Sequence, residues 1–435
     1  MGTSETAKGV RMRTPMRNRE FRALWLAEAQ SVAGDHLTTV ALAILVFDRT
    51  GSALWSAIVY AMTFLPALAG GLGLAQIADR FPRRTVLVTC ALGQAAAIGA
   101  MAIPGAPLAL LCVLVVVARL IGAPVNAAQN ALTREVFTDD DVFLRSQDLR
   151  SITNNIAMLV GFAGGGMLVA TVGVSWALTI DAASFAVTAL VVRLCVWPRP
   201  TPGDRTDPWF RATRWVFARR RLRVLLAFSW LVGLTMIPEG LVAPLAHEIG
   251  ASDHAVGWLF AADPVGFILG TFLLSRFVSA EGRRALLGVL ATAASATLVL
   301  FVFQPGLGAA LALLAVAGAA GAYIVTVGAT FITWVPNDLR GGAGGLYRTG
   351  LRVAQGLGIA LGGVVAESLG SATHAIALAG VAGVVLTIPV AISWHRVRKD
   401  EIEGTGAVPD EAGPEGAGPE APEGLRKVKP APENG

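Results

Sequence analysis

Charged side chains occur inside long apolar runs of this 435-residue chain. Asp35, followed by His36, lies near the middle of the first run, and Arg119 lies about 12 residues, or ~18 Å, into the fourth. Each such charge costs about 2.5–3.5 kcal/mol at a bilayer centre on insertion scales. Burial favours the protonated form of an aspartate and a nearby arginine favours the charged form, so an Asp35–Arg119 pair can exchange a proton. The alternative is a static ion pair that fixes helix packing.

Other polar residues within the apolar runs are candidates for a central binding cavity. Glu239 follows Pro238, and a proline-broken helix offers backbone groups to a ligand, so we expect Glu239 to contact substrate or protons. Asp181 and Asp263 are expected to be structural. For the cavity lining we expect His36, Asn126, Asn155, Tyr323, Thr326 and Thr330, with helix packing as the alternative for each.

The sequence offers no group typical of metal, disulfide or nucleotide chemistry. Its three cysteines have no paired spacing, which argues against a disulfide framework or a zinc site. None of the four lysines lies in a G-x-x-x-x-G-K-[ST] motif, so ATP hydrolysis is not expected. No clustered nucleophile is present. We therefore expect no enzyme activity, no metal and no cofactor.

Composition indicates an all-α integral membrane protein. Hydrophobic residues make up 54% of the chain and charged residues 15%, whereas soluble domains carry about a quarter charged residues. The cations lie between apolar runs, which argues against a nucleic-acid-binding face. We predict twelve transmembrane helices, near 23–47, 53–78, 85–104, 107–131, 150–172, 174–196, 223–246, 255–278, 285–304, 307–333, 343–369 and 371–394.

The connections between these spans differ sharply in charge. Those that follow even-numbered spans carry many arginines, whereas the others carry Arg49 and no further Lys or Arg. Basic loops stay cytoplasmic, so both termini are expected in the cytoplasm and the protein in the inner (plasma) membrane. The expected organisation is a cytoplasmic N-terminal segment (1–22), a six-helix bundle (23–196), a basic cytoplasmic linker (197–222), a second six-helix bundle (223–396) and a disordered tail (397–435).

Glycines repeat between the two halves at a constant offset of 197 residues. Gly161, Gly165 and Gly166 in span 5 correspond to Gly358, Gly362 and Gly363 in span 11. Small residues allow helices to approach closely, and these glycines are expected to serve packing and gating. The halves are separated by an even number of spans, so the sequence predicts two parallel six-helix repeats with a binding site between them.

A short, strongly charged turn connects spans 2 and 3 and contains Asp79, Arg80, Arg83 and Arg84. The arginines alone fit an ordinary positive-inside turn. Together with Asp79, however, the turn resembles the signature loop of the major facilitator superfamily, with Ala75 and Pro82 where that family usually has glycine. The resemblance implies that this loop gates transport.

Further motifs resemble the enterobactin-exporter and macrolide-efflux branch of that superfamily. They are Phe21-Arg22…Leu24-Trp25, Gly34-Asp35, Thr50-Gly51-Ser52-Ala53, the charged loop and Asp181-Ala182-Ala183-Ser184-Phe185. The resemblance implies the major facilitator fold and proton-driven efflux of a bulky amphipathic small molecule, namely a drug, siderophore or secondary metabolite, by a monomer. The alternatives are an importer or facilitator on the same fold and, from another class, a non-transporting membrane receptor or enzyme.

Overall fold

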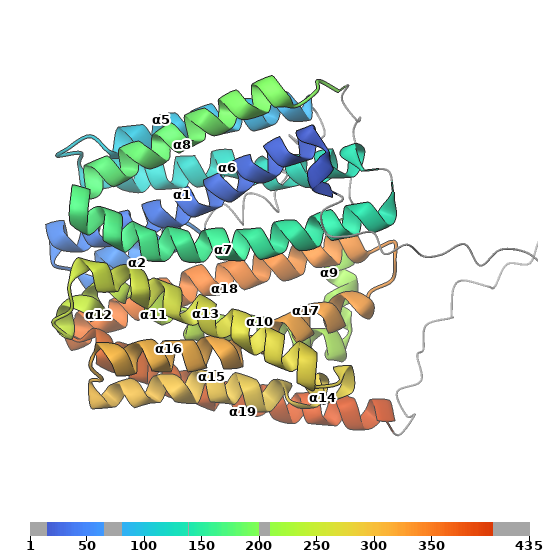
Figure 1. Ribbon diagram of the computed structural model, residues 1–435. Helices are drawn as coiled ribbons and strands as arrows, with labels where there is room; N and C mark the ends of the chain where they lie inside the picture. The colour runs from blue at the N-terminus through green and yellow to red at the C-terminus, as the bar shows by residue number, and fades with distance from the viewer. Residues whose placement is uncertain (1–14, 65–80, 138, 200–208, 403–435) are drawn as a thin grey trace, which may run out of the picture. The chain divides into compact units, whose positions relative to one another are not determined.

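Helices account for nearly all of the residues that the computed structural model describes, which are 15–64, 81–137, 139–199 and 209–402 (Figure 1). None of these residues lies in a strand. After the short turn η1 (Pro15–Arg17), the N-terminal half contains α1 (Arg19–Thr50), α2 (Ala53–Met62), α5 (Arg83–Met101), α6 (Leu108–Val136), α7 (Asp140–Val172) and α8 (Val174–Cys195).

The C-terminal half has more breaks. Its elements are α9 (Trp209–Ala218), α10 (Arg220–Thr235), α11 (Ile237–Gly240), α12 (Val242–Glu248), α13 (Asp253–Phe277), α14 (Ala280–Ala285), α15 (Leu287–Val299), η3 (Leu300–Phe303), α16 (Leu307–Gly321), α17 (Tyr323–Thr333), α18 (Arg340–Leu369) and α19 (Ala372–Ile402). Residues up to Trp394 form one unit and His395–Gly435 a second. Pro238 is the second residue of the short α11, in the first helical turn, where its missing N–H does no harm.

Ten helical segments among the described residues are long and apolar enough to cross a membrane. Two further apolar segments, Ala53–Met62 and Leu287–Phe303, are shorter. The expected all-α membrane protein is confirmed. The count of twelve spans stays a prediction, because the second expected span, 53–78, extends into residues 65–80, outside the described ranges.

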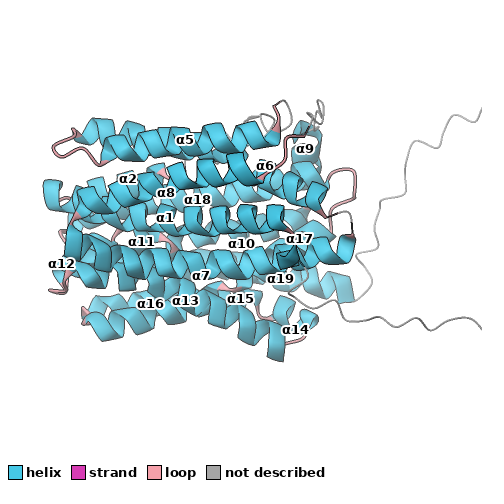
Figure 2. Ribbon diagram, turned by 45° about the horizontal axis from the view of Figure 1, so that its top comes forward, coloured by secondary structure: helices cyan, strands magenta, loops and turns pink. Residues whose placement is uncertain are grey.

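Figure 2 shows the helices of the first unit packed against one another. In the N-terminal half, α1 packs against α7 and α8, and α5 packs against α6 and α8. In the C-terminal half, α13 packs against α16 and α10 against α18. The two halves meet through α7 with α13 and α2 with α18.

Glycine allows the backbones of the two halves to touch. A Cβ atom on Gly166 of α7 would lie 2.8 Å from the nitrogen and 2.9 Å from the Cα of Gly257 in α13. A Cβ on Gly363 of α18 would likewise overlap the Cβ of Ala57 in α2. Inside each half, close packing joins Gly161 to Ala33, Gly165 to Leu37, Gly358 to Gly233 and Gly362 to Ile237. These glycines therefore lie in direct contact with the neighbouring helices.

The bundle has two distinct ends. Its arginine-rich end, where α5 and α18 begin and α6, α8 and α13 end, carries Arg83, Arg84, Arg134, Arg193, Arg199, Arg276, Arg283, Arg284 and Arg340. At the opposite end the halves make side-chain contacts with each other. The rings of Phe47 and His247 lie 5.4 Å apart, and the Ser52 hydroxyl donates to Glu367 over 2.9 Å.

The connection between the halves contains α9, within the basic linker expected at 197–222. This helix packs against α10 and α18. Just after it, the Arg219 guanidinium lies 3.6 Å above the Trp215 ring, a cation–π contact that ties the linker to the start of α10.

Candidate functional site

Asp35 and Arg119, which the sequence places at similar depth on different spans, meet in the structure. A guanidinium nitrogen of Arg119 on α6 donates to Asp35 Oδ1 on α1 over 2.8 Å. Its other terminal nitrogen lies 3.4 Å from the Asp35 carbonyl oxygen and 3.4 Å from the Thr39 hydroxyl. The two side chains are 28% and 25% exposed, so water can reach this ion pair.

A cavity in the N-terminal half opens next to this pair. Its lining comes from α1, α2, α5 and α6 and includes Asp35, Thr39, Tyr60, Thr63 and Arg119. Thr38, Ser56 and apolar side chains form the remaining wall. Among the described lining residues, the only charged groups are the carboxylate of Asp35 and the guanidinium of Arg119, which places the ion pair where it can meet a bound molecule.

Glu239 connects the two halves. The Tyr60 hydroxyl on α2 donates to the Glu239 carboxylate on α11 in a very short hydrogen bond. Asp263 on α13 is near enough to Glu239 for the two charges to interact. The break of span 7 around Pro238 thus brings an acidic side chain to the boundary between the halves. Contact of Glu239 with substrate or protons stays a prediction.

Arg352 on α18 also lies near this boundary, and the sequence analysis did not single it out. Its charge interacts with Tyr60, Glu239 and Arg119. The guanidinium carbon lies 5.6 Å from the centre of the Phe64 ring. The sequence alone could have identified it, because Arg352 is an arginine well inside the predicted span 343–369.

A row of aromatic rings crosses from one half to the other. His36 packs edge-on against Phe162 at 4.4 Å, and Phe162 stacks on Phe260 at 5.3 Å. Tyr60 continues the row, 5.8 Å from Phe260 and 5.7 Å from Phe64. Phe162 and Phe260 are buried, so this part of the row is a packed layer between α7 and α13.

The other predicted cavity residues lie in different surroundings. Tyr323 and Thr330 are buried, and the Tyr323 hydroxyl donates to the Phe228 carbonyl over 3.0 Å. They therefore pack inside the C-terminal half and do not line an open cavity in this structure. Thr326 is half-buried. Asn155 is also half-buried and donates to the Ser151 carbonyl over 3.0 Å.

Asn126 is exposed and shares a helix face with Arg119, since seven residues are nearly two full turns. It thus lies on the cavity-facing side of α6, nearer the arginine-rich end.

Asp181 fastens α8 to α1. The Thr38 hydroxyl donates to Asp181 Oδ2 over 2.5 Å and the Ser184 hydroxyl to Oδ1 over 3.2 Å. Gly34 makes room for this carboxyl, because a Cβ there would lie 2.9 Å from Asp181 Cγ. The structural role expected for Asp181 fits this geometry, with hydroxyl groups as its partners.

The charged turn between spans 2 and 3 is described only in part. Asp79 and Arg80 lie outside the described residues. Arg83 pairs with Glu135 at the end of α6, and Arg84 donates to the Arg193 carbonyl at the end of α8. These two arginines therefore tie the start of α5 to its neighbours at the arginine-rich end.

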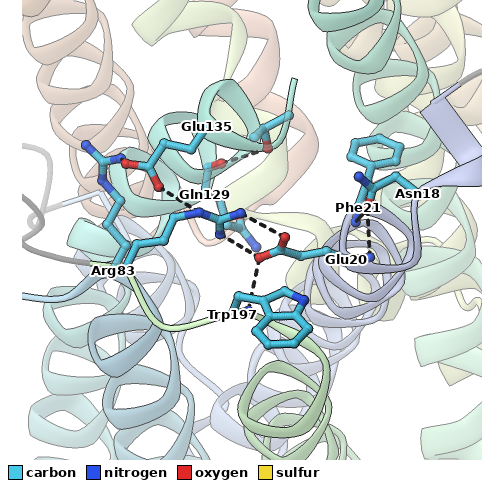
Figure 3. A network of polar contacts seen from close by, with 9 residues as sticks. Asn18, Glu20, Phe21, Arg83, Gln129, Glu135 and Trp197 are labelled. Atoms are coloured by element: carbon cyan, nitrogen blue, oxygen red, sulfur yellow. Dashed lines mark hydrogen bonds and ion pairs between the residues drawn. The ribbon is translucent and has the colours of Figure 1, made fainter. Parts of the chain in front are cut away.

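The same ion network reaches the linker and the start of α1 (Figure 3). Arg199 donates to both Glu20 oxygens over 2.6 and 2.8 Å, and its Nε lies 3.6 Å from Glu135. These hydrogen bonds raise the pKa of Arg199 above its ordinary value, against the effect of burial. The Trp197 backbone N–H also donates to Glu20. The network therefore holds the beginning of the linker against the N-terminal half.

A second ion pair, which the sequence analysis missed, is buried deeper in the N-terminal half. Arg150 on α7 donates to both oxygens of Glu28 on α1, over 2.5 and 2.9 Å, and the two side chains are only 7% and 8% exposed. Asn130 and Gln147 accept from the same arginine at 2.7 Å, and Asn154 donates to Glu28. Such complete hydrogen bonding is what a buried ion pair needs to be tolerated. Among the described residues, no group of three or more His, Cys, Asp or Glu side chains is arranged to hold a metal.

Comparison with known proteins shows which family this chain belongs to. Residues 11–415 match the sequence profile of a major facilitator superfamily family described as "transmembrane secretion effector". The multidrug efflux pump Tap of Mycobacterium tuberculosis is 27% identical over 410 residues, covering 89% of this chain and 96% of that protein. Tap of Mycolicibacterium fortuitum is 26% identical, covering 84% and 93%.

Solved structures of transporters share the fold. A bacterial homologue of the human lysosomal transporter Spinster, in an inward-facing, occupied conformation, superposes with a TM-score of 0.71 at 15% identity, covering 90% of this chain and 98% of that one. The nucleoside transporter NupG superposes with a TM-score of 0.67 at 14% identity, covering 86% and 99%.

Proposed function

We propose a function in export, since this chain belongs to the transmembrane secretion effector family of the major facilitator superfamily. It is a membrane transporter and not an enzyme. The specific proposal is proton-coupled efflux of a bulky amphipathic small molecule, with the halves rocking about a central cavity. The name of the Tap relatives, multidrug efflux pumps, supports the direction of transport.

The Asp35–Arg119 ion pair carries this proposal. It joins two spans beside a cavity, and both side chains are partly exposed. A proton that binds Asp35 removes the charge that holds Arg119, so it frees the guanidinium and loosens α1 from α6. Release of the proton restores the pair. Alternating access would let this exchange occur at one membrane face and substrate release at the other.

Two matched six-helix bundles are the proposed moving parts, with twelve spans in all. Gly166 contacts Gly257 across the halves, and Gly363 contacts Ala57. The two glycines, 166 and 363, are 197 positions apart, and their partners, 57 and 257, are 200 positions apart. This paired pattern supports an internal repeat about an axis along the membrane normal. The glycines of α7 and α18 would then act at the gate as well as in packing, and the charged turn with Asp79, Arg80, Arg83 and Arg84 would act at the other end.

The proposed orientation places the arginine-rich end and both termini in the cytoplasm, with the protein in the plasma membrane. The halves contact each other at the opposite end, through pairs such as Phe47–His247 and Ser52–Glu367. In that orientation the structure corresponds to a state closed toward the outside.

Reconstitution in sealed vesicles tests the proposal. Purified protein is given an imposed proton gradient and radiolabelled erythromycin or enterobactin, which represent macrolides and siderophores. Movement of compound against protons supports efflux. Movement in the same direction as protons would instead identify an importer, and transport that ignores the gradient would identify a facilitator.

A further inference from the structure

Arg352 belongs to α18 of the C-terminal half and lies near the boundary with the N-terminal half. It follows the start of α18 by twelve residues, or ~18 Å of helix. No hydrogen bond or ion pair joins its guanidinium to another residue within the described ranges. Within a membrane span, arginine normally pairs or faces a water-filled space because its charge is costly to bury.

The helix periodicity of α18 shows which way Arg352 faces. Leu357, Leu361 and Val364 are exposed large apolar side chains, as expected of a surface toward lipid. Arg352 lies nine residues before Leu361, which is about 180° around a helix. Arg352 is exposed as well. Its open surface therefore lies on the inner side of α18, between the two halves.

The groups around Arg352 make this space suitable for an amphipathic molecule. The buried Phe64 ring packs 5.6 Å from the guanidinium carbon, and the half-buried Tyr60, next in the row of rings, lines the cavity of the N-terminal half. Glu239, whose charge also acts on Arg352, already accepts a hydrogen bond from Tyr60. Because the guanidinium makes no hydrogen bond or ion pair within the described ranges, its donors remain available to a ligand.

We propose that Arg352 binds the negative group of the transported molecule, so that the substrates include amphipathic anions whose apolar part packs on Tyr60. The planar guanidinium suits a carboxylate or a phosphate, which it can hold with two parallel hydrogen bonds. The inference rests on the proposed transport function, since it takes the space between the halves as the substrate path. It concerns recognition of the substrate and not proton coupling.

Equilibrium dialysis of the protein in lipid nanodiscs tests this recognition without any gradient. The probes are pyrenebutyrate and pyrenebutanol, which differ in a carboxylate against a hydroxyl, and binding to empty nanodiscs is subtracted. We expect wild-type protein to prefer pyrenebutyrate. Arg352→Gln should weaken pyrenebutyrate binding by about 10- to 150-fold, as for the loss of a charge-assisted hydrogen bond, and leave pyrenebutanol binding unchanged.

Two further variants sharpen the test. Arg352→Lys, which keeps the charge but not the planar fork, should fall between wild type and Arg352→Gln. Arg276→Gln removes an arginine at the end of α13, beside Phe277, and should change neither affinity.

Equal loss of both probes in Arg352→Gln would show a packing role and overturn the inference, as would no loss of pyrenebutyrate. Wild-type protein that bound neither probe, or bound both equally, would also overturn it. Arg352-dependent binding in a protein that moves nothing under a gradient would reject the transport proposal alone.

Discussion

Replacing Gly166 by alanine should prevent the two halves from closing at the end opposite the arginine-rich end. A Cβ there would lie 2.8 Å from Gly257 N, 2.9 Å from its Cα and 3.1 Å from the His254 carbonyl oxygen. Carbon atoms in ordinary contact are about 3.5–4.0 Å apart, so α7 and α13 must separate by roughly half an ångström to one ångström. All three neighbouring atoms are backbone, which cannot rotate out of the way.

Overpacking of this kind costs about 1–3 kcal/mol. The cost applies only to the conformation in which α7 and α13 touch, so the balance between closed and open states should shift by about 5- to 150-fold. Gly164→Ala is the matched control. Gly164 lies on the same helix, and a Cβ there meets no atom within 4 Å. Any change in intrinsic helix propensity is therefore shared by both variants.

Electron spin resonance distances between labels on the two halves report the shift. Labels at Ile103→Cys and Phe303→Cys suit this purpose, because both side chains are exposed, after the exposed Cys195 has been replaced by serine. In lipid nanodiscs, Gly166→Ala should gain a population at longer distance, and Gly164→Ala should match the parent. Identical distributions in the two variants would refute the contact-based account of closure.

Two further predictions concern stability. Breaking the buried Glu28–Arg150 pair from either side should cost about 3–5 kcal/mol of folding stability, so Glu28→Gln and Arg150→Met should each lower the unfolding temperature in detergent. The double variant should recover part of that loss, because it leaves no unpaired buried charge. A loss in the double variant equal to the sum of the two single losses would contradict this reading of the pair. Burial acts to raise the pKa of Glu248, but hydrogen bonds from Thr373, Ser371 and two backbone N–H groups outweigh it and lower that pKa below its ordinary value of about 4.5. Because the pKa of Glu248 is lower in the folded protein, this side chain stabilises the fold above about pH 4.5, and its contribution is lost as the pH falls through the folded-state pKa. In wild-type protein the unfolding temperature should therefore fall as the pH drops below about 4.5, and in Glu248→Gln it should fall less steeply. The same pH profile in both proteins would count against a stabilising role of the Glu248 carboxylate.

The membrane spans could be predicted from the sequence because long apolar runs and charged turns mark them directly. The Asp35–Arg119 contact was also within reach, because both charges lie at similar depth in runs that neighbour each other in the family resemblance. Depth along a helix says little about direction around it. Tyr323, Thr326 and Thr330 share a helical face, yet Tyr323 and Thr330 turned out to be packed inside the C-terminal half.

Contacts between residues far apart in sequence were beyond such reasoning. Glu28 and Arg150 are 122 positions apart, and each on its own resembles an ordinary charge near a helix end. Arg352 is a different case. It lies inside the predicted span 343–369 and met the criterion applied to Arg119, but the sequence analysis did not apply that criterion to it.

Proton flux in vesicles containing Asp35→Asn tests the central claim most directly. Asparagine keeps the size of the side chain but cannot take up a proton, so the variant should lose gradient-driven movement of erythromycin or enterobactin and the accompanying proton flux. It should still exchange labelled for unlabelled compound at equilibrium. Uphill transport with undiminished proton flux in Asp35→Asn would contradict the account.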